Sequence, residues 1–298
     1  CSDFAIELGI NIPTGKDSLS KKQKYPNDEV IAPGTVIISA AGNCSDITQV
    51  VEPVLQKNGG SIYYINLSQD DFKLGGSSFA QTQNKIGSET PTIKDAVFFK
   101  KAFNTIQILI KDNQIVAGHD IGSGGLITTL LEMCFADVNL GANISFDAFS
   151  EKDLVKILFS ENIGLVLQAK NDSTFENALN DIEYFRLGSV TEGTTLEITH
   201  NSQPTTYNIE QYREFWFETS FLLDQKQTKN GKSLERFENF ANQPLNYVFP
   251  SHFNGKLEQI ASSQTPRNDR PKAAIIREKG SNSEREMANA MYLAGFDV

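Results

Sequence analysis

The 298-residue sequence contains little cysteine, and its three cysteines lie far apart in the chain. Cys1, Cys44 and Cys134 form neither the closely spaced pairs of a zinc site nor the even set of a disulfide framework. We therefore expect a reducing compartment, the cytoplasm. Cys134 falls on the apolar side of a predicted helix, so we expect it to be a buried packing residue.

The sequence also lacks the run of about 18 apolar residues that a membrane span requires. It begins with neither a basic segment nor an apolar stretch, so we expect no signal peptide. Acidic residues outnumber basic ones, 37 to 27, which argues against a nucleic-acid partner because such partners are bound by Lys and Arg. A nucleotide needs only a few local donors and remains compatible with this charge. We expect no membrane partner.

Hydrophobic residues make up 39% of the chain, enough for the core of a globular protein of one large or two ordinary domains. In the first part we expect helices over Ser2–Leu8, ended by Gly9, and Ile47–Gln56, strands over 10–20 and 35–43, and an exposed loop over Lys21–Asp28. In the middle we expect strands over Ser61–Leu67, Phe159–Ala169 and Phe185–Val190, helices over Lys94–Lys111 and Ser173–Asp181, and a hairpin from Leu196–His200 and Thr205–Asn208.

The chain changes character after residue 208. Gln211–Leu223 is an aromatic-rich helix that can form a binding surface or pack as a linker helix, and packing is the favoured interpretation. Gln225–Asn254 is polar with little periodicity, and Thr265–Pro271 is a linker. Lys272–Ile276 and Ser283–Leu293 predict a strand and a helix, the first step of an open α/β domain.

The segment HDIGSGGL, residues 119–126, follows an apolar run and precedes a helical pattern from Leu126 to Ala136. Free backbone amides and the helix dipole favour phosphate at such a turn, and Asp120 can hold the accompanying magnesium ion. The alternative is a tight turn between packed elements. The spacing is not a dinucleotide fingerprint, because Ile127 stands where a third glycine is required. We expect His119 to be a structural hydrogen-bonding residue.

Two other glycine turns are weaker candidates for phosphate contact. In the first, Lys16 can contact a phosphate, Asp17 can bind magnesium and Ser18 lies beside them, although the spacing is not that of a Walker A loop. The alternative is an exposed ion pair at a strand end. In the second, Gly75 and Gly76 precede two serines that can touch a phosphate or cap the next helix, and the cap is the default.

Five segments, in order along the chain, resemble one enzyme family. They are GKDSLS at 15–20, HDIGSGGL at 119–126, LEMCFA at 131–136, REFWFET at 213–219 and REKGSNSEREM at 277–287. They are similar to GKDSMS, HDRSDGGL, LAEMAFA, RVWWAET and REQGVNSHVEM of the large, single-chain form of phosphoribosylformylglycinamidine synthase. The resemblance covers essentially the whole chain.

The resemblance implies an α+β fold in the manner of the aminoimidazole-ribonucleotide synthetases. Residues 1–45 would be the C-terminal part of a barrel-forming N-type domain, and 46–208 a C-type domain with a mixed sheet and helices. Residues 209–270 would be a connector, and 271–298 the first βα unit of a class I glutamine amidotransferase domain. The chain is thus expected to be a fragment of a longer polypeptide.

The implied parent enzyme is an ATP-dependent carbon–nitrogen ligase of de novo purine biosynthesis. It would convert formylglycinamide ribonucleotide, glutamine and ATP to formylglycinamidine ribonucleotide, with glutamine as the amide donor. The cofactors would be ATP or ADP and Mg²⁺, and the partners small-molecule substrates and the rest of the parent chain. The chain alone is expected to be inactive and to hold no catalytic residue, because the glutaminase cysteine and the other magnesium ligands lie outside it.

The family's magnesium-binding aspartate matches Asp120. Gly122 and Ser123 stand where the family has serine and aspartate, so we expect contacts from the free backbone amides of this turn. Two alternatives stay open. In the first, the turn belongs to an auxiliary, structural nucleotide site. In the second, the chain belongs to another enzyme of the same superfamily, and the resemblance of residues 271–298 to an amidotransferase domain argues against that. Asp120 is thus the predicted metal ligand, and the predicted nucleotide-binding residues are Lys16, Asp17, Ser18, Gly75, Gly76, Gly122, Ser123 and Gly124.

Overall fold

A computed structural model describes residues 1–16, 21–31, 36–40, 42, 44, 46–137, 139–240, 248, 249, 251, 271–276 and 283–297. The chain divides into two units, Cys1–Lys256 and Leu257–Val298. Within the described ranges, no helix has the length and apolarity needed to cross a membrane.

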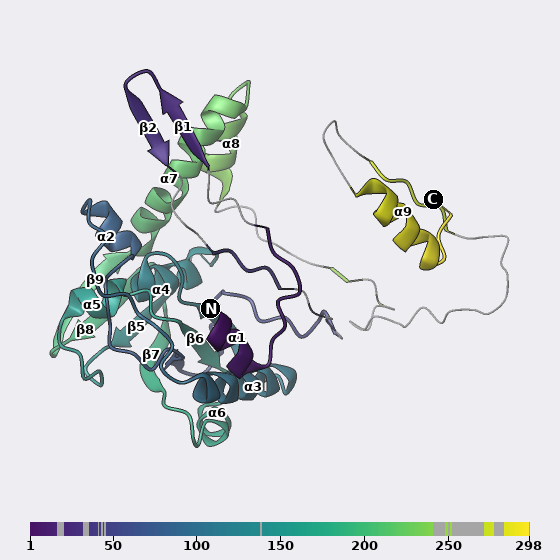
Figure 1. Ribbon diagram of the computed structural model, residues 1–298. Coiled ribbons are helices and arrows are strands. Elements are labelled where there is room, and N and C mark those ends of the chain that lie inside the picture. The colour runs from purple at the N-terminus through teal and green to yellow at the C-terminus, as the bar shows by residue number, and fades with distance from the viewer. Residues whose placement is uncertain are drawn as a thin grey trace. The chain divides into compact units, whose positions relative to one another are not determined.

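A seven-stranded mixed sheet forms the centre of the first unit, with the strand order β4-β6-β3-β7-β5-β8-β9 (Figure 1). Neighbouring strands are antiparallel except β5 and β8, which run parallel. The α+β fold with a mixed sheet, expected from the resemblance, is confirmed. The strands are β3 (Ile62–Asn66), β4 (Ile115–Asp120), β5 (Leu140–Ser145), β6 (Gly164–Ala169), β7 (Phe185–Glu192), β8 (Thr195–His200) and β9 (Gln203–Asn208).

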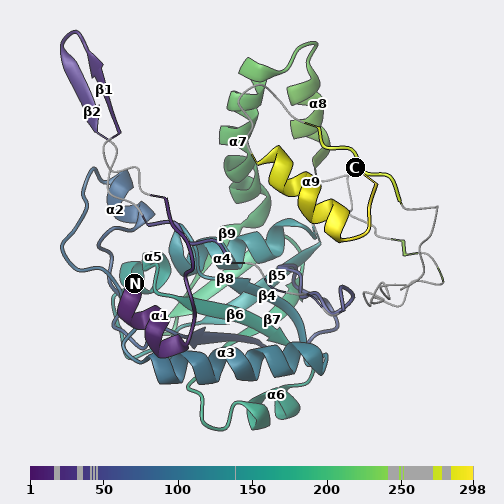
Figure 2. The ribbon, with the colours of Figure 1, turned by 45° about the vertical axis from the view of Figure 1, so that its right-hand side comes forward.

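Helices cover both faces of this sheet (Figure 2). Side chains alternate between the two faces of a strand, so Tyr63 and Ile65 of β3 face one layer while Ile62 and Tyr64 face the other. The first layer holds α3 (Ala96–Lys111) and α6 (Asp172–Ala178), and the second holds α4 (Gly125–Phe135) and α5 (Leu154–Phe159).

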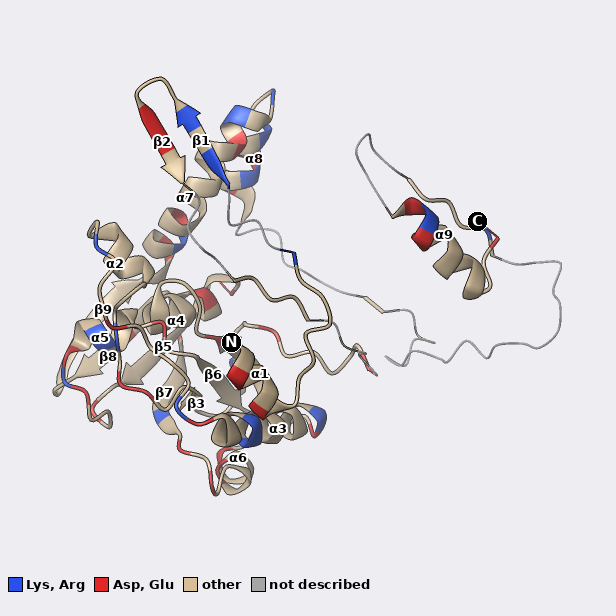
Figure 3. Cartoon of the chain, viewed as in Figure 1, with Lys and Arg blue, Asp and Glu red and all other residues tan. Residues whose placement is uncertain are grey.

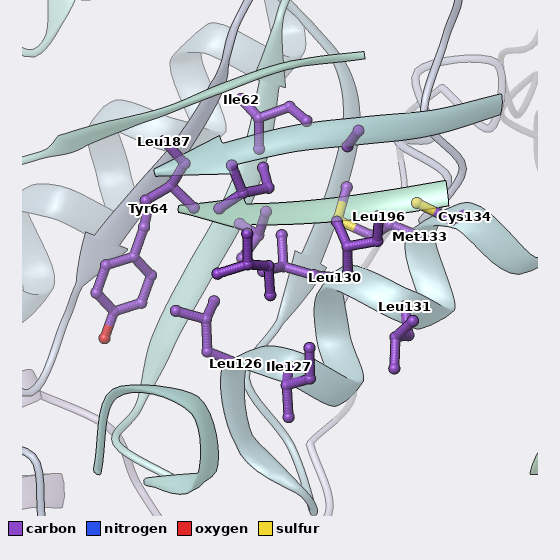
Figure 4. Close-up of a cluster of buried hydrophobic side chains, with 14 of the residues drawn as sticks. Ile62, Tyr64, Leu126, Ile127, Leu130, Leu131, Met133, Cys134, Leu187 and Leu196 are labelled. Carbon is purple, nitrogen blue, oxygen red and sulfur yellow. The ribbon is translucent and has the colours of Figure 1, made fainter. Parts of the chain in front are cut away.

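Helix α4 is the most deeply buried helix of the second layer. Leu130 and Met133 lie toward the sheet near Leu196, while Ile127 and Leu131 lie on the other side of the helix (Figure 4). Each fully buried Leu or Ile contributes about 1.5–3 kcal/mol to the free energy of folding. The helix, and the glycine turn that precedes it, are therefore held firmly against the sheet.

The two edges of the sheet differ in what lies beside them. Along β4, the Gly118 N–H donates to the carbonyl of Glu52 at 3.1 Å. At the other edge, β9 is largely exposed and contains Pro204, which has no N–H to donate. The predicted helix over Ile47–Gln56 is wrong, since no helix forms there and Pro53 lacks the N–H that a helix interior needs.

The first 40 residues differ most from the prediction. Helix α1 (Ser2–Leu8) and its left-handed cap Gly9 are confirmed. The strands expected over 10–20 and 35–43 are absent from their described residues, 10–16, 36–40 and 42. Val36, Ile37 and Ile38 are exposed and pair with no strand, and a β-branched run forms a strand only where a partner is available.

The predicted loop over Lys21–Asp28 is instead part of an exposed hairpin. Strands β1 (Lys22–Tyr25) and β2 (Asp28–Ile31) pair in antiparallel register. Strand β1 carries basic residues and β2 acidic residues (Figure 3), and the Glu29 carboxylate lies 3.4 Å from the Lys22 ammonium and 3.8 Å from that of Lys24.

In the middle of the chain, the helix expected after the second glycine turn is the short α2 (Ser78–Thr82). The strand expected to start at Phe159 starts at Gly164, because α5 ends at Phe159. Strand β5, helix α5 and the helix α8 (Lys232–Asn239) were not predicted from the sequence.

Aromatic rings join α8 to the long helix α7 (Ile209–Gln227), with Phe217 stacked on Phe240 at 4.3 Å and Phe221 on Phe237 at 4.6 Å. Trp216 of α7 packs edge-on against Phe135 of α4 at 5.9 Å, so the expected packing of this helix on the domain is confirmed, while its role as a connector stays a prediction.

The second unit contains helix α9 (Glu284–Leu293), as predicted. The strand predicted over Lys272–Ile276 is wrong, because a single bridge between Lys272 and Asp297 is the only β pairing among its described residues. The linker prediction for residues 265–270 falls outside the described residues. The domain boundaries after residues 45, 208 and 270 stay predictions.

Candidate functional site

The glycine turn of residues 121–124 joins the end of β4 to the start of α4, as predicted. Gly124 and Gly125 have positive φ angles of 92° and 75°. A Cβ atom on Gly125 would lie 2.7 Å from the Leu158 carbonyl oxygen and 2.8 Å from that of Ser160, so only glycine fits there. Around Gly122 there is open space, and both Gly122 and Ser123 are exposed.

A carboxylate from another loop binds the amide at the start of α4. The N–H of Gly124 donates to Oε1 of Glu161 at 2.8 Å, and the N–H of Ser78 donates to the same oxygen at 2.8 Å. Glu161 therefore lies where an anion is stabilised by a helix N-terminus. The expectation that the amides of this turn are free is wrong for Gly124. Among the described residues, no group accepts a hydrogen bond from the N–H of Gly122 or of Ser123, so the expectation holds for these two.

Buried polar side chains on either side of Glu161 fix its loop. The Ser160 hydroxyl donates to the Lys73 carbonyl at 3.0 Å, and the Asn162 amide donates to the Asp71 carbonyl at 3.0 Å. Ser160 and Asn162 also hydrogen-bond to each other. Because both residues are buried, these bonds cannot exchange readily with water, and the position of Glu161 is set by the segment around residue 71.

The same segment is anchored by the buried carboxylate of Asp70. Its oxygens accept from the Lys73 ammonium at 2.9 Å and from the N–H groups of Thr92 at 3.0 Å and Asp71 at 2.9 Å, and Lys94 lies 3.3 Å away. Burial by itself raises the pKa of Asp70, but these donors outweigh it and lower the pKa to about 2. Asp70 is thus an ionised structural anchor.

The second glycine turn is held by bonds within the chain. Gly75 N–H donates to the Glu89 carbonyl at 2.8 Å, and Gly76 N–H donates to the Ile86 carbonyl at 2.6 Å. The Ser77 side chain caps α2, so the default interpretation of that serine is confirmed. A nucleotide contact from Gly75 and Gly76 stays a prediction, and their N–H groups are already engaged.

The first glycine turn is described only up to Lys16, which is exposed. Asp17 and Ser18 lie outside the described residues. The predicted nucleotide contacts of these three residues therefore stay predictions.

Asp120 and His119, at the end of β4, belong to a series of polar contacts that reaches α7. His119 Nδ1 lies 2.8 Å from the Asp120 carbonyl oxygen and 3.3 Å from its Oδ1, and His119 Nε2 lies 3.1 Å from Oε2 of Glu132. The other Glu132 oxygen accepts from the Trp216 indole N–H at 2.7 Å. The structural role expected for His119 is consistent with these contacts.

Glu132 and Trp216 were not singled out as site residues from the sequence. Each lies in one of the segments that resemble the family, but local spacing gives no sign that the segments meet, since residues 132 and 216 are 84 positions apart.

The metal-binding capacity of this site is limited to one carboxylate. Asp120 has a side chain that is 79% exposed, and no group of three or more His, Cys, Asp or Glu in the described ranges is arranged to hold a metal ion. Magnesium is commonly bound through one or two protein carboxylates together with water and phosphate oxygens. Asp120 fits the role of such a single protein ligand.

Cys134 and Arg213 lie in the packed layer between α4 and α7. Cys134 is buried, which confirms the prediction of a buried packing residue, and burial raises the pKa of its thiol to about 12. Arg213 is also buried, and burial lowers the pKa of its guanidinium. The guanidinium lies 5.9 Å from the ring of Phe240, a cation–π contact.

Comparison with known proteins places this fold and these segments in one family. Residues 58–201 match the family described as AIR synthase related protein, C-terminal domain. A probable phosphoribosylformylglycinamidine synthase, chloroplastic/mitochondrial, of Arabidopsis thaliana is 37% identical over 99% of this chain and 21% of its own length. The human phosphoribosylformylglycinamidine synthase is 32% identical over 98% of this chain and 22% of its own length.

Solved structures give a weaker likeness. The chain is similar to Thermotoga maritima PurL complexed with FGAR at a TM-score of 0.45 and 16% identity, over 56% of this chain and 30% of that one. The assignment therefore rests on the sequence matches. The chain spans about a fifth to a quarter of the length of the curated relatives. It belongs to the phosphoribosylformylglycinamidine synthase family, with an AIR synthase related C-terminal domain over residues 58–201.

Proposed function

We propose that the chain is part of an ATP-dependent carbon–nitrogen ligase of purine biosynthesis that uses glutamine as its amide donor. The parent enzyme would convert formylglycinamide ribonucleotide to formylglycinamidine ribonucleotide. The observation that carries this proposal is the 37% identity, over 99% of the chain, to a relative named as a probable phosphoribosylformylglycinamidine synthase. The chain alone would be inactive, because it would hold only part of the nucleotide site and no source of ammonia.

Within that enzyme, the turn of residues 120–124 would face a magnesium-bound nucleotide. The exposed Asp120 carboxylate would contact the metal, and the amides of Gly122 and Ser123 would contact a phosphate. Bound magnesium offsets the charge of the polyphosphate. Contacts from Lys16, Asp17, Ser18, Gly75, Gly76 and Gly124 belong to the same proposal.

The Glu161 contact supports a second candidate role for the turn. With the amide of Gly124 engaged by a carboxylate, the turn has fewer donors for a developing charge than an empty glycine loop would have. A structural, non-reacting nucleotide would then stabilise the fold by binding to the folded state alone.

The test is an assay of the parent protein with formylglycinamide ribonucleotide, glutamine and Mg-ATP. We expect the amidine to form, and the 298-residue chain alone to form none even when ammonia is supplied. Asp120→Ala should weaken magnesium-dependent nucleotide binding, while Asp112→Ala, at an exposed helix end, should not. A parent protein that forms no amidine would refute the proposal. Amidine formation by the chain alone would refute the predicted inactivity.

A catalytic and a structural nucleotide can be separated by exchange. An ADP that copurifies with the parent protein and exchanges slowly, regardless of added nucleotide, would favour the structural role.

The cytoplasmic location expected from the cysteines is also part of the proposed function. The plant relative is named chloroplastic/mitochondrial.

A further inference from the structure

Residues of β4, α4 and α7 meet in one series of polar contacts. It runs from Asp120 through His119 and Glu132 to Trp216, and so joins the glycine turn to helix α7. We propose that Glu132 and Trp216 are positioning residues that act through His119 on Asp120. Helix α7 would thereby set the orientation of the metal-binding carboxylate. This inference rests on the role proposed above for Asp120.

The Asp120 side chain depends on His119 for its orientation. In the described part of the chain, the only polar group that approaches its carboxylate is His119 Nδ1, at 3.3 Å. The Asp120 backbone is held more firmly, since its carbonyl oxygen lies 2.8 Å from His119 Nδ1 and accepts from the Thr129 hydroxyl at 3.1 Å. An exposed side chain with one partner keeps much of its rotamer freedom, and the imidazole is the group that limits it.

The imidazole is in turn fixed by Glu132. His119 is partly buried, and its second ring nitrogen lies 3.1 Å from the Glu132 carboxylate. Both ring nitrogens thus face oxygen acceptors, which defines the plane of the ring. Glutamate is a long side chain with several rotamers, so its own position requires a further partner.

Trp216 supplies that partner. Its indole N–H donates to the free Glu132 oxygen at 2.7 Å, and its ring packs edge-on against Phe135 at 5.9 Å. The two carboxylate oxygens of Glu132 are thereby both used, one by the imidazole and one by the indole. The packing fixes the indole on α4, so a displacement of α7 changes the support of Glu132.

A simpler role for these contacts is a latch that only holds α7 on the domain. A latch predicts that removing the indole N–H lowers the free energy of unfolding and leaves metal affinity unchanged. Positioning predicts in addition a change in the magnesium dependence of nucleotide binding. Trp216→Phe separates the two roles, because phenylalanine keeps an aromatic ring against Phe135 and loses the donor.

The experiment is calorimetric titration of the parent protein with ADP at a series of magnesium concentrations. Relative to wild type, we expect Trp216→Phe and Glu132→Ala to raise the half-saturating magnesium concentration at least threefold. Leu222→Ala, an exposed position on the same helix, is the matched control and should leave it unchanged. Asp120→Ala gives the effect of removing the metal ligand itself.

A direct readout uses the single tryptophan of the 298-residue chain. With 5-fluorotryptophan incorporated, the chain gives one fluorine resonance, from Trp216. We expect that resonance to shift in His119→Asn relative to wild type.

The outcomes distinguish this inference from the function on which it rests. Unchanged magnesium dependence in Trp216→Phe and Glu132→Ala, with a clear effect of Asp120→Ala, overturns the positioning role and leaves the magnesium assignment intact. Unchanged magnesium dependence in Asp120→Ala overturns both. A fluorine resonance that is insensitive to His119→Asn also overturns the coupling.

Discussion

The Glu161 carboxylate and the Gly124 amide lie 2.8 Å apart, and the same Glu161 oxygen accepts the N–H of Ser78. One side chain thus joins the turn that follows β4 to the turn that precedes α2. Its negative charge lies at the N-terminus of α4, the end of a helix that favours anions.

Replacing Glu161 with alanine should therefore destabilise the chain. The N–H groups of Gly124 and Ser78 lose their acceptor, at a cost of about 1–3 kcal/mol in the free energy of unfolding. Glu161→Gln keeps an amide oxygen as acceptor and should lose less. Urea unfolding measures both, with the exposed Glu183→Ala as the control. If Glu161→Ala is no less stable than Glu183→Ala, the bridging role is wrong.

The glycines of the turn should differ sharply in their tolerance of substitution. Gly125→Ala forces a Cβ into the carbonyl oxygens of Leu158 and Ser160 at a positive φ, and should cost about 2–5 kcal/mol. Gly122→Ser, which introduces the serine of the resembling family segment, meets open space and should change stability by less than about 0.5 kcal/mol. Thermal unfolding of the two variants checks this, and equal melting temperatures would contradict it.

The ionisation of Asp70 should make the free energy of unfolding depend on pH. Its pKa in the folded state is about 2, below the ordinary value of 3.8, so its contribution is complete above about pH 4 and is lost between about pH 4 and pH 2. At pH 7, Asp70→Asn should lose on the order of 2 kcal/mol. Urea unfolding at several pH values should show this difference shrinking towards pH 2. A difference that does not vary with pH would refute the assignment.

Gln168 should be the glutamine of the sheet whose replacement lowers the free energy of unfolding most. It is 0% exposed; its side chain accepts from the Gln56 N–H at 2.8 Å and donates to the carbonyls of Gln56 at 2.9 Å and Gly60 at 3.2 Å. Gln168→Ala leaves these groups unpaired and should cost about 2–4 kcal/mol. Guanidinium unfolding measures this cost. The exposed Gln83→Ala is the control, and an equal effect of the two changes would show that the buried amide contributes nothing.

The central elements were predictable because their signals are local. Helix α3 shows apolar periodicity, and Asp95 caps its first turn. The hairpin of β8 and β9 was visible from two alternating segments around Asn201 and Ser202, both of which have positive φ. Val36, Ile37 and Ile38 have equally strong strand composition and form none, because a strand also needs a partner that composition does not reveal.

The candidate site was predictable only in part, for a similar reason. The turn around Gly122 is a local pattern and was identified. The acceptor of the Gly124 amide comes from Glu161, 37 positions away, and could not be inferred from spacing. The same holds for Trp216 and Glu132, which meet only because α7 packs on α4.

Each edge of the sheet has one feature that limits pairing: a hydrogen bond from Gly118 of β4 to Glu52, and Pro204 within β9. Unprotected edges invite pairing with strands of other domains. Relatives are four to five times longer than this chain, so a domain of this kind is made while tethered to neighbours at high local concentration. In the long parent polypeptide proposed above, we expect these two features to hinder strand exchange between this domain and its neighbours during synthesis.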